Sequence, residues 1–243
     1  MVEYSAETYG ERIAAIYDEL YASYDPAAIH FLAQLARTGP ALELGIGTGR
    51  FALPLQAMGI EVHGIDASPA MVERLHAKPG GERIMVTIGD FTTVEIEKKF
   101  PLIYVVFNTI FGLLTQENQI RCFENVARHL ESDGVFVIEA FVPDLKRFVD
   151  SQSLRVVNIN NDSVQLDASK VDIPNQTITA NHLHLSGQGV QVFPVRLRYI
   201  WPAEMDLMAR LAGMRLRQRW SSWDQAAFTS NSQRHISLYE LAE

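Results

Sequence analysis

Hydrophobic and polar positions along the chain follow two patterns, one typical of buried strands and one typical of amphipathic helices. In the segment 116–130, Ile120, Phe123, Ala127 and Leu130 recur at helical spacing. Short apolar runs, each ended by glycine, an acid or a turn, occur at 41–44, 60–65, 84–88, 102–108 and 135–141. Strands that alternate with helices in this way predict a doubly wound α/β sheet that is buried on both faces.

Helix start signals precede two of the predicted helices. Asp25 followed by Pro26 indicates an N-cap and a first helical residue, and Ser68 followed by Pro69 repeats the signal. Upstream, the segment 9–25 is predicted as one helical stretch that carries four tyrosines. Residues 1–40 are therefore predicted to form an N-terminal helical cap.

The pattern changes after Asp144. Residues 152–200 consist of extended stretches separated by Asn-Asp, Pro-Asn and Gly-Gln-Gly turns, which predict an inserted antiparallel sheet. A helix at 202–214 and strands at 215–220 and 235–241 follow. We expect one domain over 1–243 with the insertion attached to it.

Composition narrows the class of protein. A net charge of −8 argues against a nucleic-acid partner, and no run approaches the ~18 apolar residues of a membrane span, so we expect neither partner. Cys122 is the sole cysteine, which rules out an intrachain disulfide and favours a reducing compartment. The first residues lack the basic flank of a signal peptide, and we expect a cytoplasmic protein.

The stretch 41–51, ALELGIGTGRF, places three glycines on the turn after the first predicted strand. This turn is the usual ligand anchor of an open parallel sheet. A mononucleotide P-loop needs Lys-Ser/Thr after the last glycine, where Arg50-Phe51 stands. The dinucleotide pattern, with two residues before its third glycine, is also missed, although an NAD-dependent oxidoreductase stays an alternative.

Four motifs together resemble the class I S-adenosylmethionine-dependent methyltransferases, in the branch that acts on small molecules such as natural products and amino sugars. They are LELGIGTGR (42–50), VHGIDASPAMVERL (62–75), IGDF (88–91) and FNTIFGLL (107–114). The resemblance covers residues 9–142. It implies a Rossmann-like seven-stranded sheet, mostly parallel with an antiparallel last strand, and an inserted β lid at 152–200 that forms a substrate roof.

The resemblance also implies a cofactor site at successive strand ends. Glu43 and the backbone of the three glycines would hold the methionine end, Asp66 the ribose hydroxyls and Asp90 the adenine amino group. Read singly, each acid also has a structural explanation, as a helix-dipole partner, an N-cap or a turn residue. The implied cofactor-binding residues are Tyr9, Arg12, Glu43, Gly45, Gly47, Gly49, Asp66, Ala67, Met71, Gly89, Asp90, Phe91, Phe107 and Asn108.

The predicted reaction is methyl transfer from S-adenosylmethionine to a small molecule, most often at an amine nitrogen, with oxygen or carbon as alternatives. Candidate catalytic residues are Tyr17 on the N-terminal segment, Glu139 near the end of the fifth strand and His184 on the insertion. His182 and His184 share a strand face, but further ligands for a metal are missing and none is predicted. A homodimer is possible. A non-catalytic S-adenosylmethionine-binding regulator is the alternative outside enzymes.

Overall fold

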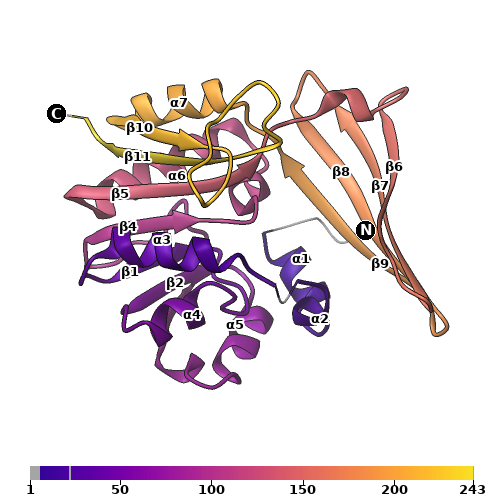
Figure 1. The fold of residues 1–243 in the computed structure, drawn as a ribbon, viewed down its shortest axis with the longest axis horizontal. Coiled ribbons are helices and arrows are strands. Elements are labelled where there is room, and N and C mark those ends of the chain that lie inside the picture. Colours follow the sequence, from indigo (N-terminus) through magenta and orange to yellow (C-terminus); the bar gives the residue numbers. More distant parts are fainter. Residues whose placement is uncertain (1–5, 22, 243) are drawn as a thin grey trace.

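The protein is described as a computed structural model that covers residues 6–21 and 23–242. Its larger sheet has seven strands in the order β10-β11-β5-β4-β1-β2-β3 (Figure 1). The pairs among β1 to β5 are parallel, and β11 runs antiparallel to both β5 and β10. The predicted mostly parallel sheet with an antiparallel last strand is confirmed. Its strands are β1 (Ala41–Leu44), β2 (Val62–Asp66), β3 (Met85–Ile88), β4 (Phe100–Val105), β5 (Leu130–Phe141), β10 (Met214–Trp220) and β11 (Arg234–Leu241).

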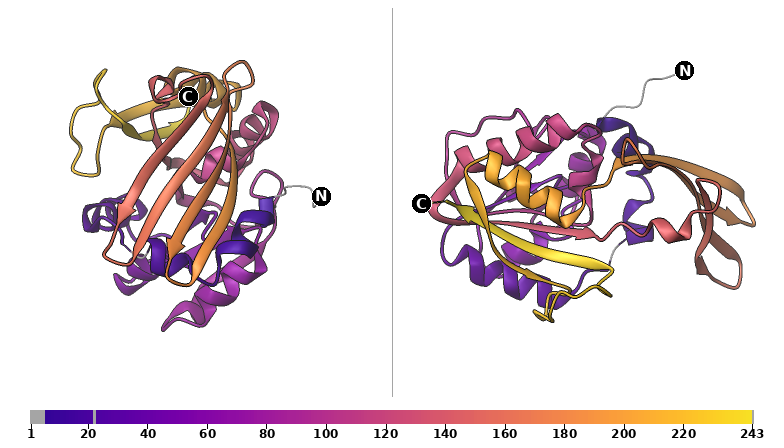
Figure 2. Two further views of the ribbon diagram at one scale, coloured as in Figure 1. Left: turned by 90° about the vertical axis from the view of Figure 1, so that its right-hand side faces the viewer. Right: turned by 90° about the horizontal axis from the view of Figure 1, so that it is seen from above.

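Helices cover both faces of this sheet (Figure 2). One core lies between the sheet and helices α6 (Gln116–His129) and α7 (Pro202–Leu211). The other lies under α3 (Pro26–Ala36), α4 (Ala52–Ala57) and α5 (Pro69–His76). Alternate residues of β4 enter the two cores, as expected for a strand buried on both faces. Asp25 and Ser68 cap α3 and α5 as predicted.

The fifth strand starts earlier than expected. Asp133-Gly134 predicts a turn before the strand, but β5 runs from Leu130 without interruption. Leu130 pairs with Phe100 of β4, and a register shift between Phe100 and Leu102 absorbs the extra residues. Pairing with a neighbouring strand therefore overrides the local turn signal.

A separate four-stranded antiparallel sheet occupies the predicted insertion. It consists of β6 (Gln152–Ile159), β7 (Ser163–Asp172), β8 (Thr177–Ser186) and β9 (Gly189–Arg198), in that order. Ile178 and Ala180 of β8 belong to a buried core, so their face of the sheet is the inner one. Figures 1 and 2 show the sheet standing beside the larger one and facing its strand ends.

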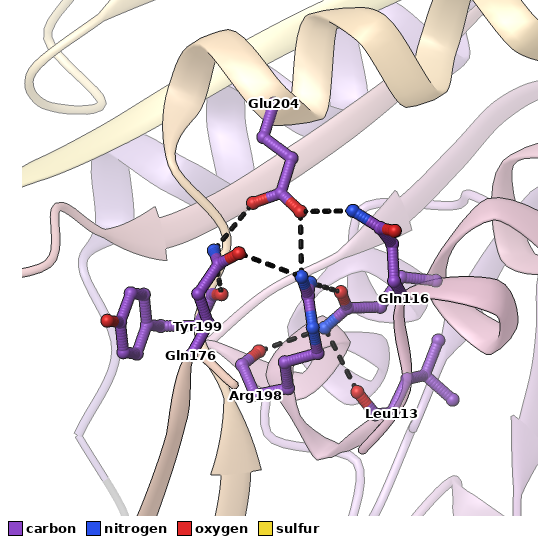
Figure 3. Close-up of polar contacts among 7 residues, drawn as sticks. Leu113, Gln116, Gln176, Arg198, Tyr199 and Glu204 are labelled. Atoms are coloured by element: carbon purple, nitrogen blue, oxygen red, sulfur yellow. Dashed lines mark hydrogen bonds and ion pairs between the residues drawn. The ribbon is translucent and has the colours of Figure 1, made fainter. Parts of the chain in front are cut away.

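A buried polar network joins the base of this second sheet to the helices (Figure 3). Arg198 of β9 donates to Gln119 of α6, to Gln176 at 2.9 Å and to Glu204 of α7 at 2.8 Å. Gln119 in turn donates to the Leu113 carbonyl at 3.0 Å. Because Arg198 is only 6% exposed, its guanidinium depends on these partners for compensation. The network fixes where the second sheet stands.

The N-terminal segment forms two helices, so the prediction of one helical stretch is wrong. They are α1 (Ala6–Ile13) and α2 (Tyr17–Tyr21), and both lie between the two sheets (Figure 1). Glu11 accepts hydrogen bonds from the Ser68 hydroxyl (2.7 Å) and the Ala70 N–H (3.1 Å). Asp18 accepts from the Thr48 hydroxyl (2.6 Å) and from Lys78 (2.8 Å). Each short helix therefore has its own attachment, α1 through Glu11 and α2 through Asp18. Among the described residues, no helix is long and apolar enough to cross a membrane.

Candidate active site

Three glycines shape the turn after β1. Their φ angles are +71° for Gly45, +55° for Gly47 and +80° for Gly49, a backbone region that side chains disfavour. A Cβ on Gly45 would lie 2.3 Å from Thr109 Cγ2, and one on Gly49 would lie 2.2 Å from Leu75 Cδ1. The turn can therefore present only main chain to the strand-end edge. Such a cradle fits the methionine end of the expected cofactor, which carries no phosphate.

Glu43 lies under this turn and is buried. Its carboxyl accepts a hydrogen bond of 2.9 Å from the Tyr104 hydroxyl, the two residues being register partners on β1 and β4. Burial raises the pKa of Glu43 to about 8, although Tyr104, Arg50 and the Ala52 N–H each favour the ionised form. A cation brought beside this buried acid, such as a cofactor ammonium, would favour its ionised form.

Asp66 ends β2 and reaches back to the glycine turn. Its carboxylate accepts hydrogen bonds from the Gly47 N–H at 2.7 Å and the Ser68 N–H at 2.9 Å. Burial raises its pKa, and these backbone bonds oppose the rise. Asp90 follows β3 and accepts from the Thr92 N–H at 2.8 Å. Parallel pairing brings Glu43 within β1, Asp66 at the end of β2 and Asp90 after β3 to one edge of the sheet.

The predicted adenine contacts surround the same edge. Met71 is buried in the first turn of α5, and its methyl group lies 3.2 Å from where a Gly47 Cβ would stand. Ala67 is half-buried, and Phe91 packs against the core beside Asn125, which donates to the Phe91 carbonyl at 3.0 Å. The Gly89 N–H donates to the Asp66 carbonyl at 2.9 Å and ties the ends of β3 and β2 together.

Phe107 and Asn108 form a strained turn after β4, with φ angles of +57° and +64°. Non-glycine residues rarely adopt this conformation, and it persists where the surroundings enforce it. Glu139 holds the turn in this conformation. Its carboxylate accepts a hydrogen bond from the Phe107 N–H at 3.1 Å, and its main-chain carbonyl accepts one from the Asn108 N–H. The Asn108 side chain accepts from the Phe141 N–H at 2.7 Å. Glu139 also lies 3.6 Å from Arg234.

The Phe107 ring belongs to an aromatic and cationic cluster at this edge. The Arg50 guanidinium carbon lies 3.8 Å from the ring centroid of Phe107, and Tyr21 meets the same ring edge-on at 5.5 Å. Tyr17 stacks beside Tyr21 at 5.1 Å. Burial raises the pKa of Tyr17 to about 12, with Arg50 opposing the rise. Tyr17 therefore keeps its proton at neutral pH.

The remaining predicted residues lie on the N-terminal helices and the second sheet. Tyr9 of α1 hydrogen-bonds the Tyr21 hydroxyl, and Arg12 is exposed on the last turn of α1. His184 of β8 lies on the inner face, 3.4 Å from the Gln191 amide oxygen on β9. One row away, His182 pairs with Asp167 of β7.

Sequence reasoning missed several residues of this region. Asp18 and Lys78 attach α2 to the glycine turn. In the sequence, Arg50 indicates only that the turn is not a phosphate-binding loop, whereas in the structure its guanidinium lies over the Phe107 ring. Asp167 was also missed. The alternation of β7 and β8 could have placed it on the inner face, but not opposite His182, because register depends on the turn that joins the strands.

Comparisons with known proteins support one family. A methyltransferase domain model matches residues 41–134. The solved CcbJ methyltransferase of Streptomyces caelestis is 38% identical, with 99% of this chain and 100% of that chain covered and a TM-score of 0.93. The sugar N-methyltransferase KedS8 of a Streptoalloteichus species is 20% identical, with 100% and 99% covered and a TM-score of 0.68. A putative Bacillus subtilis methyltransferase, YqeM, is 28% identical over 130 residues, 52% of this chain and 53% of its own length.

These likenesses decide between the alternatives left open by the glycine turn. The CcbJ relative is a methyltransferase, and CalS10 and MtfA, which share the fold, have been solved with S-adenosylmethionine bound. The cofactor is S-adenosylmethionine, and the glycine turn with its strand-end acids fits it. The chain belongs to the S-adenosylmethionine-dependent methyltransferases and transfers a methyl group.

Proposed function

We propose that the chain methylates an amine nitrogen of a small molecule, of natural-product or amino-sugar type. The observation that carries the proposal is the cluster of Tyr17, Tyr21 and Phe107 where the glycine edge meets the second sheet. Aromatic faces beside carboxylates suit an organic cation such as a protonated amine. The sugar N-methyltransferase KedS8 shares the fold, and the charge of −8 disfavours a nucleic-acid acceptor.

The test uses matched acceptors. The protein is incubated with S-adenosylmethionine and an amino sugar, and separately with the parent sugar that carries a hydroxyl in place of the amine. Mass spectrometry then looks for the gain of one methylene unit. We expect methylation of the amine and not of the hydroxyl. Methylation of the hydroxyl alone would assign oxygen as the acceptor, and methylation of carbon would appear as a product resistant to N-demethylation.

We further propose that the cofactor lies along the strand-end edge. Glu43 and the glycine turn would hold its methionine end and Asp66 its ribose, with Phe107 and Asn108 beside the sulfonium. Adenine would lie between Ala67, Met71 and Phe91 and hydrogen-bond to Asp90, while Tyr9 and Arg12 close the site. Calorimetry with S-adenosylhomocysteine tests the central acid. We expect Asp66→Ala to bind about 10- to 100-fold more weakly, the loss of hydrogen bonds to a charged group. Asp172→Ala, exposed on the second sheet, is the control.

A homodimer through the outer face of the second sheet is also proposed. Two complete rows of aliphatic side chains cross all four strands there. Within the described part of the chain, none of them joins a buried core. They are Val156, Leu166, Leu183 and Val192 in one row, and Ile159, Val164, Leu185 and Val190 in the other.

Size and symmetry favour a second copy as the occupant of this face. Four strands of about ten residues give the whole outer face a footprint of about 19 by 33 Å, or about 600 Å², which is below the roughly 800 Å² per partner of a standard interface but large enough for a weaker one. In a two-fold dimer the same patch meets its own copy, and rows without charged residues then bring no like charges together. Sedimentation should show a dimer that Leu183→Lys converts to a monomer. A monomeric parent protein at all concentrations contradicts the proposal.

A further inference from the structure

The inner face of the second sheet carries a polar row that the cofactor site does not use. Arg155, Asp167, His182 and Phe193 are register partners on β6, β7, β8 and β9. His182 Nδ1 and Asp167 Oδ1 are hydrogen-bonded, and Arg155 lies 3.8 Å from the other carboxylate oxygen. The Asp167 side chain is 16% exposed and that of His182 31%. A half-buried carboxylate therefore orients a histidine that is more exposed than the carboxylate itself.

The Asp167 contact selects one tautomer of His182. The Asp167 carboxylate accepts a hydrogen bond from the Nδ1–H, so the neutral imidazole carries its lone pair on Nε2. An acceptor at Nε2 and a carboxylate behind Nδ1 form the arrangement in which an imidazole takes a proton from a substrate and is stabilised as imidazolium.

Electrostatic interactions with helix α2 link this pair to the glycine edge. Burial raises the pKa of Tyr21 and the Asp167 charge raises it further, so the two side chains interact electrostatically. Tyr21 also contacts Phe107 and Tyr17, and Tyr17 interacts with the carboxyls of Glu43 and Asp66. The row on the second sheet and the acids of the first thus face each other across two tyrosines.

We propose that His182 is the general base of the reaction and that Asp167 is its positioning residue. This inference rests on the proposed amine acceptor. An amine binds largely as an ammonium at neutral pH and has no lone pair in that form. Transfer of one N–H proton to His182 Nε2 frees the lone pair, which attacks the methyl carbon. The C–S bond breaks, its electron pair stays on sulfur, and the imidazolium later returns its proton to water.

The other predicted catalytic residues suit this step less well. Tyr17 has a raised pKa and holds its proton. Glu139 is engaged with the Phe107 N–H and with Arg234. His184 faces an amide oxygen of Gln191, which stabilises an imidazolium less than a carboxylate does. Asp167 gives His182 the one charged partner that its role requires.

The charges around His182 come from several elements. Asp167 faces it from β7 and Arg155 from β6, and His184 lies two residues along β8. Arg147, at the end of the turn Leu145–Arg147, interacts with both Asp167 and Arg155, and Tyr21 faces Asp167 from α2. Asp167 is the anion in this set that contacts the ring directly.

The experiment compares His182→Gln, Asp167→Asn and the control Asn181→Gln, which changes the neighbouring residue on the outer face of β8. The acceptor is the amine that the wild type methylates in the matched panel. We expect kcat to fall about 100-fold in His182→Gln, within the range for loss of a general base. The kcat of Asp167→Asn should fall about 10-fold, as expected for a residue that orients a functional histidine, with little change in KM. Asn181→Gln should match wild type.

Two readouts separate a base from a structural residue. Wild-type kcat should level off as pH rises, whereas kcat of His182→Gln should keep rising as the amine deprotonates in solution. Added imidazole should restore turnover to His182→Ala. Binding of S-adenosylhomocysteine shows that each variant is folded. A wild-type pH profile in His182→Gln, or no rescue by imidazole, overturns the inference. A panel in which only the hydroxyl is methylated overturns the proposed function instead, and the ammonium step with it.

Discussion

We expect the two sheets to supply two halves of the active site, and they bring their polar residues together in different ways. At the edge of the seven-stranded sheet, the main chain defines the site. Glycines with positive φ shape the turn, backbone N–H groups orient Asp66, and Glu43, Asp66 and Asp90 lie at or near the ends of successive strands. On the four-stranded sheet the polar side chains meet across strands, as Asp167 and His182 do. One half depends on local sequence and the other on strand register.

This difference assigns separate tasks to the two halves. A main-chain cradle tolerates few changes, which suits a cofactor that all members of the family share. A sheet face changes its chemistry whenever a side chain in a row is replaced, without altering the backbone. We therefore expect substitutions in the second sheet to affect the acceptor and substitutions in the glycine turn to affect the cofactor.

The attachment of the second sheet allows the strongest test of this division. Arg198→Ala removes the guanidinium that Gln119, Gln176 and Glu204 surround (Figure 3). Loss of one partner from a buried charged network costs about 3 kcal/mol or more. We expect the free energy of unfolding to fall by about this amount in urea titrations, and amides of β6–β9 to lose exchange protection before those of β1–β5.

Arg215→Ala is the matched control. Arg215 pairs with Glu240 at 2.9 Å, but its side chain is 55% exposed. An exposed ion pair contributes about 0 to 1 kcal/mol. Equal losses from the two substitutions would show that the network does not anchor the sheet.

Substitution in the glycine turn should have a smaller effect on stability and a larger one on the cofactor. Gly49→Ala places a Cβ at φ +80°, where it meets Leu75 and Leu53. A strained backbone of this kind costs about 2 kcal/mol. We expect that loss in the free energy of unfolding, together with binding of S-adenosylhomocysteine too weak to measure by calorimetry.

Gly187→Ala, in the turn between β8 and β9, is the control for this change. No atom lies within 4 Å of the Cβ that it would add. Cofactor binding equal to wild type in Gly49→Ala would contradict the cradle, and weakened binding in Gly187→Ala would contradict the division of tasks.

The parts of the molecule that the sequence predicts well are those whose signals are local. Apolar runs placed β1, β2 and β4. The acids near the ends of the first three strands follow from the same kind of run, because parallel strands end at one edge of the sheet. Caps at Asp25 and Ser68 are equally local. The inserted sheet was predictable as extended chain with turns, and its position after the fifth strand is confirmed.

The parts that were missed depend on contacts between distant residues. The break between α1 and α2 accompanies the separate contacts of Glu11 with Ser68 and of Asp18 with Thr48. The partner of His182 depends on the register of a hairpin with two ten-residue strands, and a shift of one residue would turn Asp167 to the other face. Arg198 carries no motif, and only the packing of α6 and α7 explains its burial.

The smallest expected effect concerns Glu43 and is measured as protons released when the cofactor binds. Its folded pKa of about 8 lies above the ordinary value, so the protonated form is the favoured one in the free protein. The stability that protonated Glu43 contributes to the fold is fully present below the ordinary carboxyl pKa and is lost as pH rises through about 8. A cofactor ammonium beside Glu43 favours the ionised form, so binding near pH 7 should release close to one proton.

The measurement is calorimetry with S-adenosylhomocysteine between pH 6 and 8, in buffers with different ionisation enthalpies. Affinity for the wild type should rise up to about tenfold per pH unit, or about 1.4 kcal/mol. Glu43→Gln keeps the shape of the neutral carboxyl but has no proton to release, so its affinity should vary little with pH, while Tyr104 can still donate to the amide oxygen. Proton release that persists in Glu43→Gln would assign it to another group, with Asp66, whose pKa burial also raises, as the first to examine.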